Sequence, residues 1–375
     1  MKVAIDTGPE KGNGVSGIGV NTKYLVNSLQ KQVKKGKNFQ IECFDFSNNA
    51  KRLEEDKFDI VHYPYFHPYF LTLSTVKYAK TIVTIHDLIP LVYPKQYPSG
   101  FKGKLRFIIQ KRRLKNVDAV LTISETSKKD VVRFLNFPAE KVHAIHIAPS
   151  PIFKKENERK KLNGIVSKYN LPTKFVLYLG DVYYNKNIPT LVLACKKAKI
   201  PLIIVGKQAT EIENNLLISL KNIKGPKDWL RYLNNSPHPE TSHYKLLKEM
   251  FDKEGEVIRL GFVPDEDLVP IMNLATVYCQ PSYYEGFGLG VVHAFSCGVP
   301  VVAARTQALV EVAGEAALFA DPFDPDVMAS KISELLENPS LRAQYIRKAN
   351  ERLKKYSWKK TAKKVIGMYR QVLEK

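Results

Sequence analysis

The segment PSYYEGFGLGVVHAFSCGVPVV combines an acid, a glycine-rich turn and a histidine at a spacing that suits a phosphorylated sugar. Glu285 ends an apolar run, the Gly286–Gly288 turn opens a helical stretch, and His293 follows Glu285 by eight residues. A carboxylate accepts two hydroxyl hydrogen bonds, and backbone N–H groups at a helix N-terminus bind phosphate. Eight helical residues span about 12 Å, so Glu285 and His293 are predicted to contact opposite ends of one ligand. The alternative is a structural strand–helix turn with an acid at its start.

A second candidate, Lys186, lies in LYLGDVYYNKNIPTL directly before a predicted helix. A cation at a helix N-terminus opposes the helix dipole unless an anion binds there too. This position predicts that Lys186 binds a diphosphate. The alternative is a solvated lysine.

His86 and Asp87 follow an apolar strand in the segment TIHDLIPL. Side chains at the carboxyl end of a parallel strand face the ligand-binding crevice of such sheets. There His86 can bind a sugar hydroxyl or a developing charge, with Asp87 fixing its tautomer. The alternatives are a structural histidine and an aspartate that caps the next turn.

The run GNGVSGIGV places four glycines between the first strand and the first helix, namely Gly12, Gly14, Gly17 and Gly19. Glycines let the backbone approach a phosphate closely. The spacing is not GxGxxG, so a flexible turn explains the run equally well.

No metal site is expected. Two acidic pairs, Asp265-Glu-Asp267 and Asp324-Pro-Asp326, imitate those of metal-dependent transferases. Both precede predicted helices, where aspartates also serve as N-terminal caps.

The elements that must position these residues alternate between strands and helices, which predicts parallel sheets covered by helices on both faces. The first half suggests strands at 3–6, 39–46, 59–63, 81–86, 119–124 and 142–147, with helices at about 20–35, 102–116 and 125–136. Residues 149–173 contain three prolines and the run KKENERKK, which predicts a solvated linker.

The alternation resumes with strands at 175–180, 201–206, 257–261, 277–281 and 299–303 and helices from about 187 and 287. The polar stretch 207–255 is predicted to be an irregular insertion, and the residues after Asp324 three helices broken at Asn338-Pro339 and Tyr356-Ser357. The sequence therefore predicts two doubly wound α/β domains facing a cleft. They comprise 1–168 and 169–356, with a final helix at 357–375 that returns to the first domain.

The net charge of +21 is concentrated in the first domain. Residues 1–168 contain 30 Lys+Arg and 15 Asp+Glu, and the segment Lys102–Lys115 has seven basic residues and no acid. Phe101, Leu105, Ile108 and Ile109 follow helical spacing, so 101–115 is predicted to be a basic amphipathic helix. It either turns its apolar stripe to the core or lies on an anionic membrane or a phosphorylated acceptor. A nucleic-acid partner is not expected, since no such motif is present.

Composition favours a cytoplasmic protein. No apolar run is long enough to cross a bilayer, and the N-terminus does not have the pattern of a signal peptide. The four cysteines, Cys43, Cys195, Cys279 and Cys297, form no CxxC pair and lie in apolar stretches. They are expected to be buried free thiols.

Taken with their order, these segments resemble the retaining glycosyltransferases of family four, which have the GT-B fold. TIHDLIPLVYP, LTISETSKKDVVRFL and YLGDVYYNKNIPTL are similar to segments of that family, as are PSYYEGFGLGVVHAFSCGVPVV and the C-terminal region from Gly314. The resemblance covers the chain outside 207–255. It implies an acceptor-binding first domain and a second domain that binds a nucleotide sugar.

Residue by residue, the resemblance implies that Glu285 contacts the transferred sugar, Lys186 the phosphate and His86 the sugar. Gly17 and Gly19 would lie in the loop near the diphosphate. Phe287, Gly288 and Leu289 would line the sugar and phosphates through their backbone. Three residues depart from the family pattern: His293 replaces a glutamate at the ribose, Gly290 a proline, and Asp181 an arginine.

The function expected from the resemblance is retaining transfer of a hexose, mannose or a related sugar, in surface polysaccharide or glycoconjugate synthesis. The donor would be a nucleotide diphosphate sugar of the GDP or UDP type, used without metal or other cofactor. The acceptor would be a glycan or lipid-linked, with the enzyme at the inner face of the membrane. Two alternatives are a non-catalytic protein that binds a nucleotide sugar or glycan and, less favoured, a nucleic-acid binder.

Overall fold

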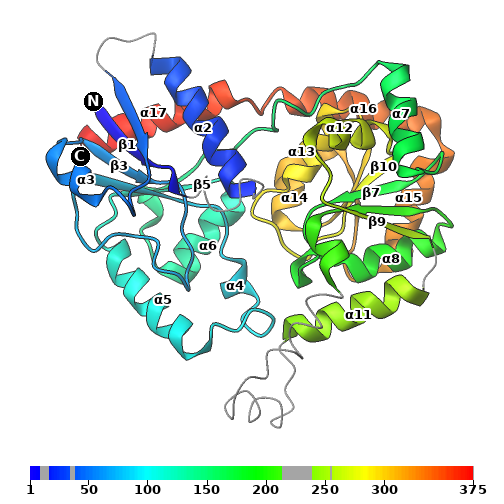
Figure 1. Ribbon diagram of the computed structural model, residues 1–375, viewed down its shortest axis with the longest axis horizontal. Helices are drawn as coiled ribbons and strands as arrows, with labels where there is room; N and C mark the ends of the chain where they lie inside the picture. Colours follow the sequence, from blue (N-terminus) through cyan, green and yellow to red (C-terminus); the bar gives the residue numbers. More distant parts are fainter. Residues whose placement is uncertain (9–16, 34–38, 213–238, 254–255, 375) are drawn as a thin grey trace. The chain divides into compact units, whose positions relative to one another are not determined.

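The computed structural model describes residues 1–8, 17–33, 39–212, 239–253 and 256–374, which form two compact units (Figure 1). The first unit comprises Met1–Pro94, Pro98–Ser150 and Lys355–Lys375, and the second comprises Lys95–Tyr97 and Pro151–Lys354. The expected boundary after residue 168 falls inside helix α7 (Arg159–Tyr169), which belongs to the second unit.

The first unit is built on a six-stranded parallel sheet of order β2-β1-β3-β4-β5-β6. Its strands are β1 (Lys2–Asp6), β2 (Gln40–Phe44), β3 (Ile60–Tyr63), β4 (Lys80–Ile85), β5 (Ala119–Thr122) and β6 (Val142–Ala144). All six were predicted from the sequence. Every residue of β3 and β5 is buried, as expected for central strands covered on both faces.

Helices cover both faces of this sheet. They are α2 (Gly17–Val33), α3 (Ala50–Glu55), α4 (Ile89–Val92), α5 (Gly100–Leu114), α6 (Glu125–Leu135) and α17 (Trp358–Glu374). Figure 1 shows α17 in red alongside α2 in blue. Ser28 of α2 donates a hydrogen bond to the carbonyl of Trp358, and Val365 and Tyr369 of α17 are fully buried against the sheet. The C-terminal helix is therefore part of the first unit's core.

The second unit repeats the plan with a parallel sheet of order β12-β11-β10-β7-β8-β9. Its strands are β7 (Val176–Leu179), β8 (Leu202–Val205), β9 (Val257–Gly261), β10 (Val277–Gln280), β11 (Val301–Ala304) and β12 (Leu318–Ala320). The fold class, two doubly wound parallel α/β units, is confirmed. The short strand β12 was not predicted, because its three residues carry too little pattern.

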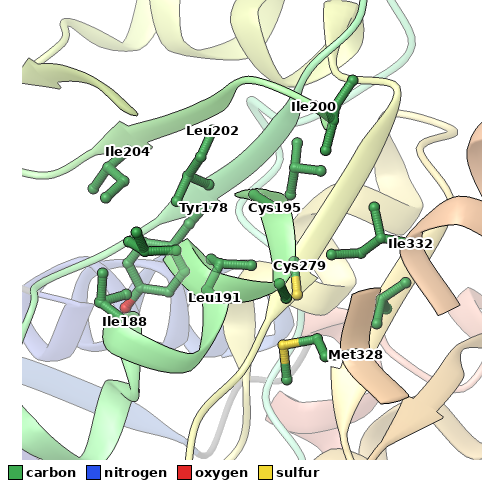
Figure 2. Close-up of a cluster of buried hydrophobic side chains, with 14 of the residues drawn as sticks. Tyr178, Ile188, Leu191, Cys195, Ile200, Leu202, Ile204, Cys279, Met328 and Ile332 are labelled. Carbon is green, nitrogen blue, oxygen red and sulfur yellow. The ribbon is translucent and has the colours of Figure 1, made fainter. Parts of the chain in front are cut away.

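The helices whose bounds are described in the second unit are α7, α8 (Ile188–Lys197), α11 (Pro239–Lys253), α12 (Asp265–Leu274), α13 (Leu289–Ser296), α14 (Gln307–Ala313), α15 (Pro325–Glu337) and α16 (Pro339–Leu353). Figure 2 shows how their apolar side chains meet those of the sheet: Leu191 and Cys195 of α8 lie near Cys279 of β10 and Met328 of α15. Cys195, Cys279 and Cys297 are buried free thiols as predicted, whereas Cys43 is half-buried.

The predicted breaks between the last three helices are confirmed. Asn338 accepts a hydrogen bond from the N–H of Leu341 and so caps α16, and Asp324 caps α15 through the N–H groups of Asp326 and Val327. Proline follows each cap at the first helical position, where its missing N–H costs no hydrogen bond.

Two sequence-based predictions in the second unit were wrong. Residues 149–173 are not simply a linker, because α7 packs against α12 and buries Ile165. The stretch 207–255 is not irregular throughout, because α11 buries His243, Tyr244 and Leu247. Both helices are so polar on their exposed faces that their sparse apolar positions gave a weak signal. Residues 213–238 lie outside the described part of the chain.

A buried histidine ties α17 to the first sheet. His62 of β3 is fully buried, with Nδ1 2.6 Å from the hydroxyl of Tyr369 and Nε2 2.8 Å from Oγ1 of Thr84. Burial lowers the pKa of His62 to about 3, with His86 adding to the effect. The ring is therefore neutral and depends on these two partners.

Tyr369→Phe is expected to lower the free energy of unfolding by about 1–3 kcal/mol, because one ring nitrogen of His62 loses its partner in an apolar core. Urea unfolding followed by circular dichroism measures the loss. Arg370→Ala, an exposed position on the same helix, is the control and should stay within about 0.5 kcal/mol of wild type. Equal stabilities for the two variants would show that the His62 contact does not stabilise the unit.

Candidate functional site

Two of the predicted site residues, Lys186 and Glu285, form an ion pair in the second unit. The ammonium of Lys186 lies 2.8 Å from Oε1 and 2.9 Å from Oε2 of Glu285. The side chains are only 22% and 9% exposed. An ion pair this shielded from solvent is screened less by salt than a surface pair.

Adjacent strands bring the two residues together. Lys186 ends the short 3₁₀ helix Tyr184–Lys186 after β7, and Glu285 follows β10, which pairs directly with β7. The two loops are joined by hydrogen bonds: Tyr283 N–H donates to the carbonyl of Asn185 at 2.8 Å, and the Asn185 amide donates to the carbonyl of Tyr284. The carboxyl edge of the sheet thus fixes the pair, as the position of the motifs predicted.

The residue after Lys186 explains the shape of this loop. Asn187 has a φ of 54°, in the left-handed region that asparagine tolerates better than most residues. Its side chain amide donates to the carbonyls of Pro281 and Pro322. Because Asn187 intervenes, α8 begins at Ile188 rather than directly after Lys186. The anion that forms the ion pair with Lys186 is the carboxylate of Glu285.

Polar neighbours from the end of β10 fix the carboxylate of Glu285. Oε1 accepts hydrogen bonds from the amide of Gln280 at 2.8 Å and from the hydroxyl of Ser282 at 2.7 Å, in addition to Lys186. Oε2 accepts from Lys186. A carboxylate has about four acceptor sites on its two oxygens, so Oε2 retains capacity for a ligand hydroxyl.

The turn after Glu285 requires glycine at one position. Gly288 has a φ of 98°, and a Cβ there would lie 2.5 Å from Cδ2 of Leu309. Phe287 is buried, and α13 begins at Leu289. The backbone from Gly286 to Leu289 therefore leads into a helix N-terminus, where N–H groups favour an anion.

The sequence predicted about 12 Å between Glu285 and His293, on the assumption that all eight residues from one to the other are helical. This assumption was wrong. Only Leu289–His293 is helical, which gives a rise of about 6 Å along the axis. The ring of His293 stacks on Phe153, with centroids 4.0 Å apart and planes inclined by 10°. Burial lowers the pKa of His293 to about 3, so the imidazole is neutral and does not repeat the charge of a glutamate.

His86 and Asp87 lie in the first unit, directly after β4. The Nε2 of buried His86 lies 3.1 Å from the carbonyl of Pro64, so this nitrogen carries the proton and donates. Burial lowers the pKa of His86 to about 4. Asp87 accepts a hydrogen bond from the N–H of Ile89 two residues on, and the N-cap position of α4 is occupied by Leu88. A role for His86 at a sugar stays a prediction.

Gly17 and Gly19 also belong to the first unit. They form the first turn of α2, three residues before the helix start expected from the sequence. A Cβ at Gly17 would meet nothing within 4 Å, so packing does not demand glycine there. Gly12 and Gly14 lie outside the described residues. Contact of this run with a diphosphate stays a prediction.

Three further acids that the sequence singled out are Asp181, Asp267 and Asp324. Burial raises the pKa of Asp181, and the charge of nearby Lys186 opposes this rise. Asp267 accepts hydrogen bonds from Lys168 and Tyr169, which lower its pKa, and Asp324 caps α15. Within the described ranges, no group of three or more His, Cys, Asp or Glu side chains is arranged to hold a metal ion.

The basic helix α5 turns its apolar stripe outward. Phe101 is 84% exposed, Leu105 52% and Ile108 50%. The helix packs through Gly103, Gln110 and Leu114 instead. The core-facing alternative is therefore wrong for three of the four stripe residues, and Ile109 is half-buried.

A loop beside α5 extends this surface. Gln110 donates to Thr72 Oγ1 at 2.7 Å and Arg113 donates to the carbonyl of Leu73. Phe70 and Leu71 of this loop are exposed, and Arg106 lies 6.0 Å from the Phe70 ring. We call Phe70, Leu71, Phe101, Leu105, Ile108 and the exposed cations Lys102, Lys104, Arg106, Arg112 and Lys115 the aromatic–basic face.

Sequence reasoning missed Tyr278, Gln280 and Ser282, which surround Glu285, and Phe153, which stacks on His293. The available signal was the alternation of polar residues through an otherwise apolar strand, in the run VYCQPS. A polar residue in a strand buried on both faces needs a hydrogen-bond partner. Here the hydrogen bonds run from Tyr278 through Gln280 to Glu285. Nothing in the sequence indicated the Phe153 stack.

Comparison with known proteins places the chain in a family. The model described as "Glycosyl transferases group 1" matches residues 165–352, and "Glycosyltransferase Family 4" matches residues 20–148. The O-antigen chain mannosyltransferase B of Escherichia coli is 29% identical over 300 residues, which cover 78% of this chain and 70% of the relative. The MMP alpha-(1->4)-mannosyltransferase of Mycolicibacterium hassiacum is 24% identical over 269 residues, covering 71% of this chain and 57% of the relative.

Solved structures share the fold over the full length. Sucrose-phosphate synthase from Thermosynechococcus elongatus superimposes with a TM-score of 0.68 at 18% identity, covering 100% of this chain and 99% of that one. Alr3699/HepE of Anabaena, solved with UDP and glucose, gives 0.68 at 14% identity and covers 98% of both chains. With half of the chain matched by the group 1 model, the chain belongs to the glycosyl transferases of group 1, as a GT-B glycosyltransferase of the family 4 type.

Proposed function

We propose that this glycosyltransferase moves a hexose, with mannose favoured, from a nucleoside diphosphate sugar to a glycan or lipid-linked acceptor, with retention at the anomeric carbon and without a metal ion. The observation that carries the proposal is the shielded Lys186–Glu285 pair directly before the glycine turn at the start of α13. The names of the two mannosyltransferase relatives favour mannose, and the neighbour solved with UDP and glucose supports a nucleotide sugar donor.

The pair suits a ligand that is anionic at one end and rich in hydroxyls at the other. A diphosphate competes with a carboxylate for an ammonium group, because its oxygens are strong charge-assisted acceptors. We expect Lys186 to bind the diphosphate together with the N–H groups at the start of α13. Glu285, still fixed by Gln280 and Ser282, then accepts hydrogen bonds from the sugar.

The chemical step we propose is a displacement on one face of the sugar. The bond between the anomeric carbon and the diphosphate oxygen breaks, and the acceptor hydroxyl oxygen forms its bond on that same face. The acceptor proton passes to the departing phosphate oxygen. Lys186 and the helix N-terminus stabilise the negative charge that develops on the leaving group, and Glu285 orients the sugar.

The departures at His293 and Asp181 motivate the second candidate, a protein that binds a nucleotide sugar without transfer. A neutral imidazole offers one donor and one acceptor in place of a carboxylate. Asp181 lies close enough to Lys186 for the lysine charge to act on the pKa of Asp181. Release of free nucleoside diphosphate separates the two functions: binding of the donor without release favours the second.

Lys186→Ala and Glu285→Gln are expected to lower kcat by about 10²–10³-fold, because each removes one preorganised charge from the reacting centre. The measurement is release of nucleoside diphosphate from GDP-, UDP- and ADP-sugars, after a thermal-shift screen identifies the donor that stabilises the wild type. Glu285→Gln keeps the shape of the side chain and guards against a variant that fails to fold.

The matched control is Lys197→Ala, which breaks an exposed ion pair between Lys197 of α8 and Asp326 of α15. This variant should retain wild-type turnover. Wild-type turnover in Lys186→Ala or Glu285→Gln would overturn the assignment of the site.

We further propose that the first unit contacts an anionic membrane through 101–115 and the rest of the aromatic–basic face. Residues 60–117 contain ten Lys+Arg and one acid, Asp87, and the exposed Phe101, Leu105 and Ile108 lie among these cations. Apolar side chains that enter the interface, flanked by cations that meet anionic headgroups, are the two contributions that bind peripheral helices to bilayers. No helix among the described residues combines the length and apolarity needed to span a bilayer.

Sedimentation with phosphatidylcholine vesicles containing phosphatidylglycerol tests this contact. Replacing Lys102, Lys104 and Arg106 with glutamine should weaken binding about 100-fold at low salt, at about 1 kcal/mol per cation. Replacing Phe101, Leu105 and Ile108 with serine should weaken it to a similar degree. The control, with the exposed Lys359, Lys363 and Lys364 of α17 replaced by glutamine, loses the same charge and should bind as wild type. Equal loss in the control would exclude a specific membrane face.

A further inference from the structure

A chain of buried polar side chains leads from the interior of the second sheet to Glu285. The Tyr278 hydroxyl donates to Oε1 of Gln280 at 2.5 Å. The amide nitrogen of Gln280 donates to Ser282 Oγ at 2.9 Å and to Glu285 Oε1 at 2.8 Å. The Ser282 hydroxyl also donates to Oε1 of Glu285. Tyr278 and Ser282 are fully buried, and Gln280 is nearly so.

The direction of this chain is fixed at its outer end, by Glu285. An ionised carboxylate only accepts hydrogen bonds, so the Gln280 amide turns its NH₂ end toward Glu285 and its oxygen end toward Tyr278. Burial raises the pKa of Tyr278 well above its usual range, with the charge of Glu285 adding to the rise, so the hydroxyl keeps the proton that it donates to this oxygen. A carboxylate in this position needs donors, and a reversed amide would place an oxygen against it.

Both ends of the Gln280 amide have partners. Its nitrogen donates toward Ser282 Oγ and Glu285 Oε1, and its oxygen accepts from Tyr278. A buried network in which both ends of an amide are hydrogen-bonded holds one arrangement, because reversing the amide leaves polar groups unpaired. Removing the Tyr278 hydroxyl should therefore free the Gln280 amide to turn and so disturb the position of the Glu285 carboxylate.

The chain also explains the glycine at position 290 of α13, where the family resemblance has a proline. A Cβ on Gly290 would lie 1.9 Å from the Tyr278 hydroxyl, 2.7 Å from its Cζ and 2.9 Å from Oε1 of Gln280. No side chain fits there while the tyrosine keeps its place. The hydroxyl of Tyr278 occupies the space that a side chain at 290 would fill.

We infer that Tyr278, Gln280 and Gly290 form one positioning device for Glu285, in which Tyr278 orients Gln280, Gln280 fixes Oε1 of Glu285, and Gly290 provides the space. Oε1 is saturated by Gln280, Ser282 and Lys186. The device therefore presents Oε2 to the hydroxyls of the transferred sugar. This inference rests on the proposed function, because it assigns the oxygen of Glu285 that contacts the sugar.

The experiment compares stabilisation by two ligands, the donor nucleotide sugar and the matching nucleoside diphosphate without sugar. Gln280→Met, Tyr278→Phe and Gly290→Ala should each lose most of the extra thermal shift that the sugar gives. They should keep the shift given by the nucleoside diphosphate. Replacing a residue that only stabilises the fold would lower the melting temperature and would leave the extra thermal shift given by the sugar unchanged.

Kinetics provide the second readout. We expect kcat to fall about 10-fold in Tyr278→Phe and about 100-fold in Gln280→Met, a range set by loss of one oriented group at an active site. In a Glu285→Gln background, Gln280→Met should lower kcat by less than about 2-fold, because residues that act through one another are not additive.

Two matched controls separate positioning from folding. Gly164→Ala replaces another helical glycine of the second unit, where a Cβ meets nothing within 4 Å. Tyr369→Phe removes a buried tyrosine hydroxyl in the first unit. Both should keep the sugar-specific shift and wild-type kcat.

The outcomes distinguish failure of this inference from failure of the proposed function. If no nucleotide sugar stabilises or reacts with the wild type, the proposed function fails. If the wild type responds and Gln280→Met responds equally, or loses the same factor in the Glu285→Gln background, the positioning device is wrong and the function stands.

Discussion

The second unit is organised around a carboxylate that is almost removed from solvent. Burying Glu285 without compensation would be strongly unfavourable, because an isolated ionised group loses its hydration. Lys186 supplies the opposite charge, and Gln280 and Ser282 supply neutral donors. This requirement explains why the loops after β7 and β10 are joined by hydrogen bonds, and why polar residues interrupt the apolar strand β10.

Under the proposed function, the same pair responds to a ligand. Lys186 is the more exposed partner, and its ammonium is on a flexible stem, so we expect it to exchange the carboxylate for a diphosphate with little movement of the backbone. Glu285 would keep its two neutral donors. A buried pair contributes little to stability by comparison with apolar residues of similar volume, which supports the proposal that this pair serves ligand binding.

Much of the fold was predictable because parallel sheets need short, almost wholly apolar strands that alternate with helices. All six strands of the first sheet and five of the second followed from this alternation, and the last three helices from the breaks at Asn338-Pro339 and Tyr356-Ser357. Lys186 and Glu285 were predictable from their place at strand ends. What failed depended on contacts distant in sequence: the outward stripe of α5, the stacking of His293 on Phe153, and the link from Tyr278 to Gly290. Spacing along a helix reveals which residues share a face, and the packing partners decide where that face points.

The departures from the family pattern are correlated in the structure. Gly290 accompanies Tyr278, whose hydroxyl fills the space a side chain would need. His293 accompanies Phe153, whose ring lies parallel to the imidazole. These two substitutions are thus each matched by a neighbour, which is the arrangement expected when a site is retained with altered contacts.

The most direct measurement is a crystal structure of the protein with its nucleotide sugar. The account predicts that Lys186 Nζ lies about 3 Å from a diphosphate oxygen and that Glu285 Oε2 accepts a hydrogen bond from a sugar hydroxyl. A bound nucleotide sugar that touches neither residue, with the Lys186–Glu285 pair as it is in the protein alone, would contradict it.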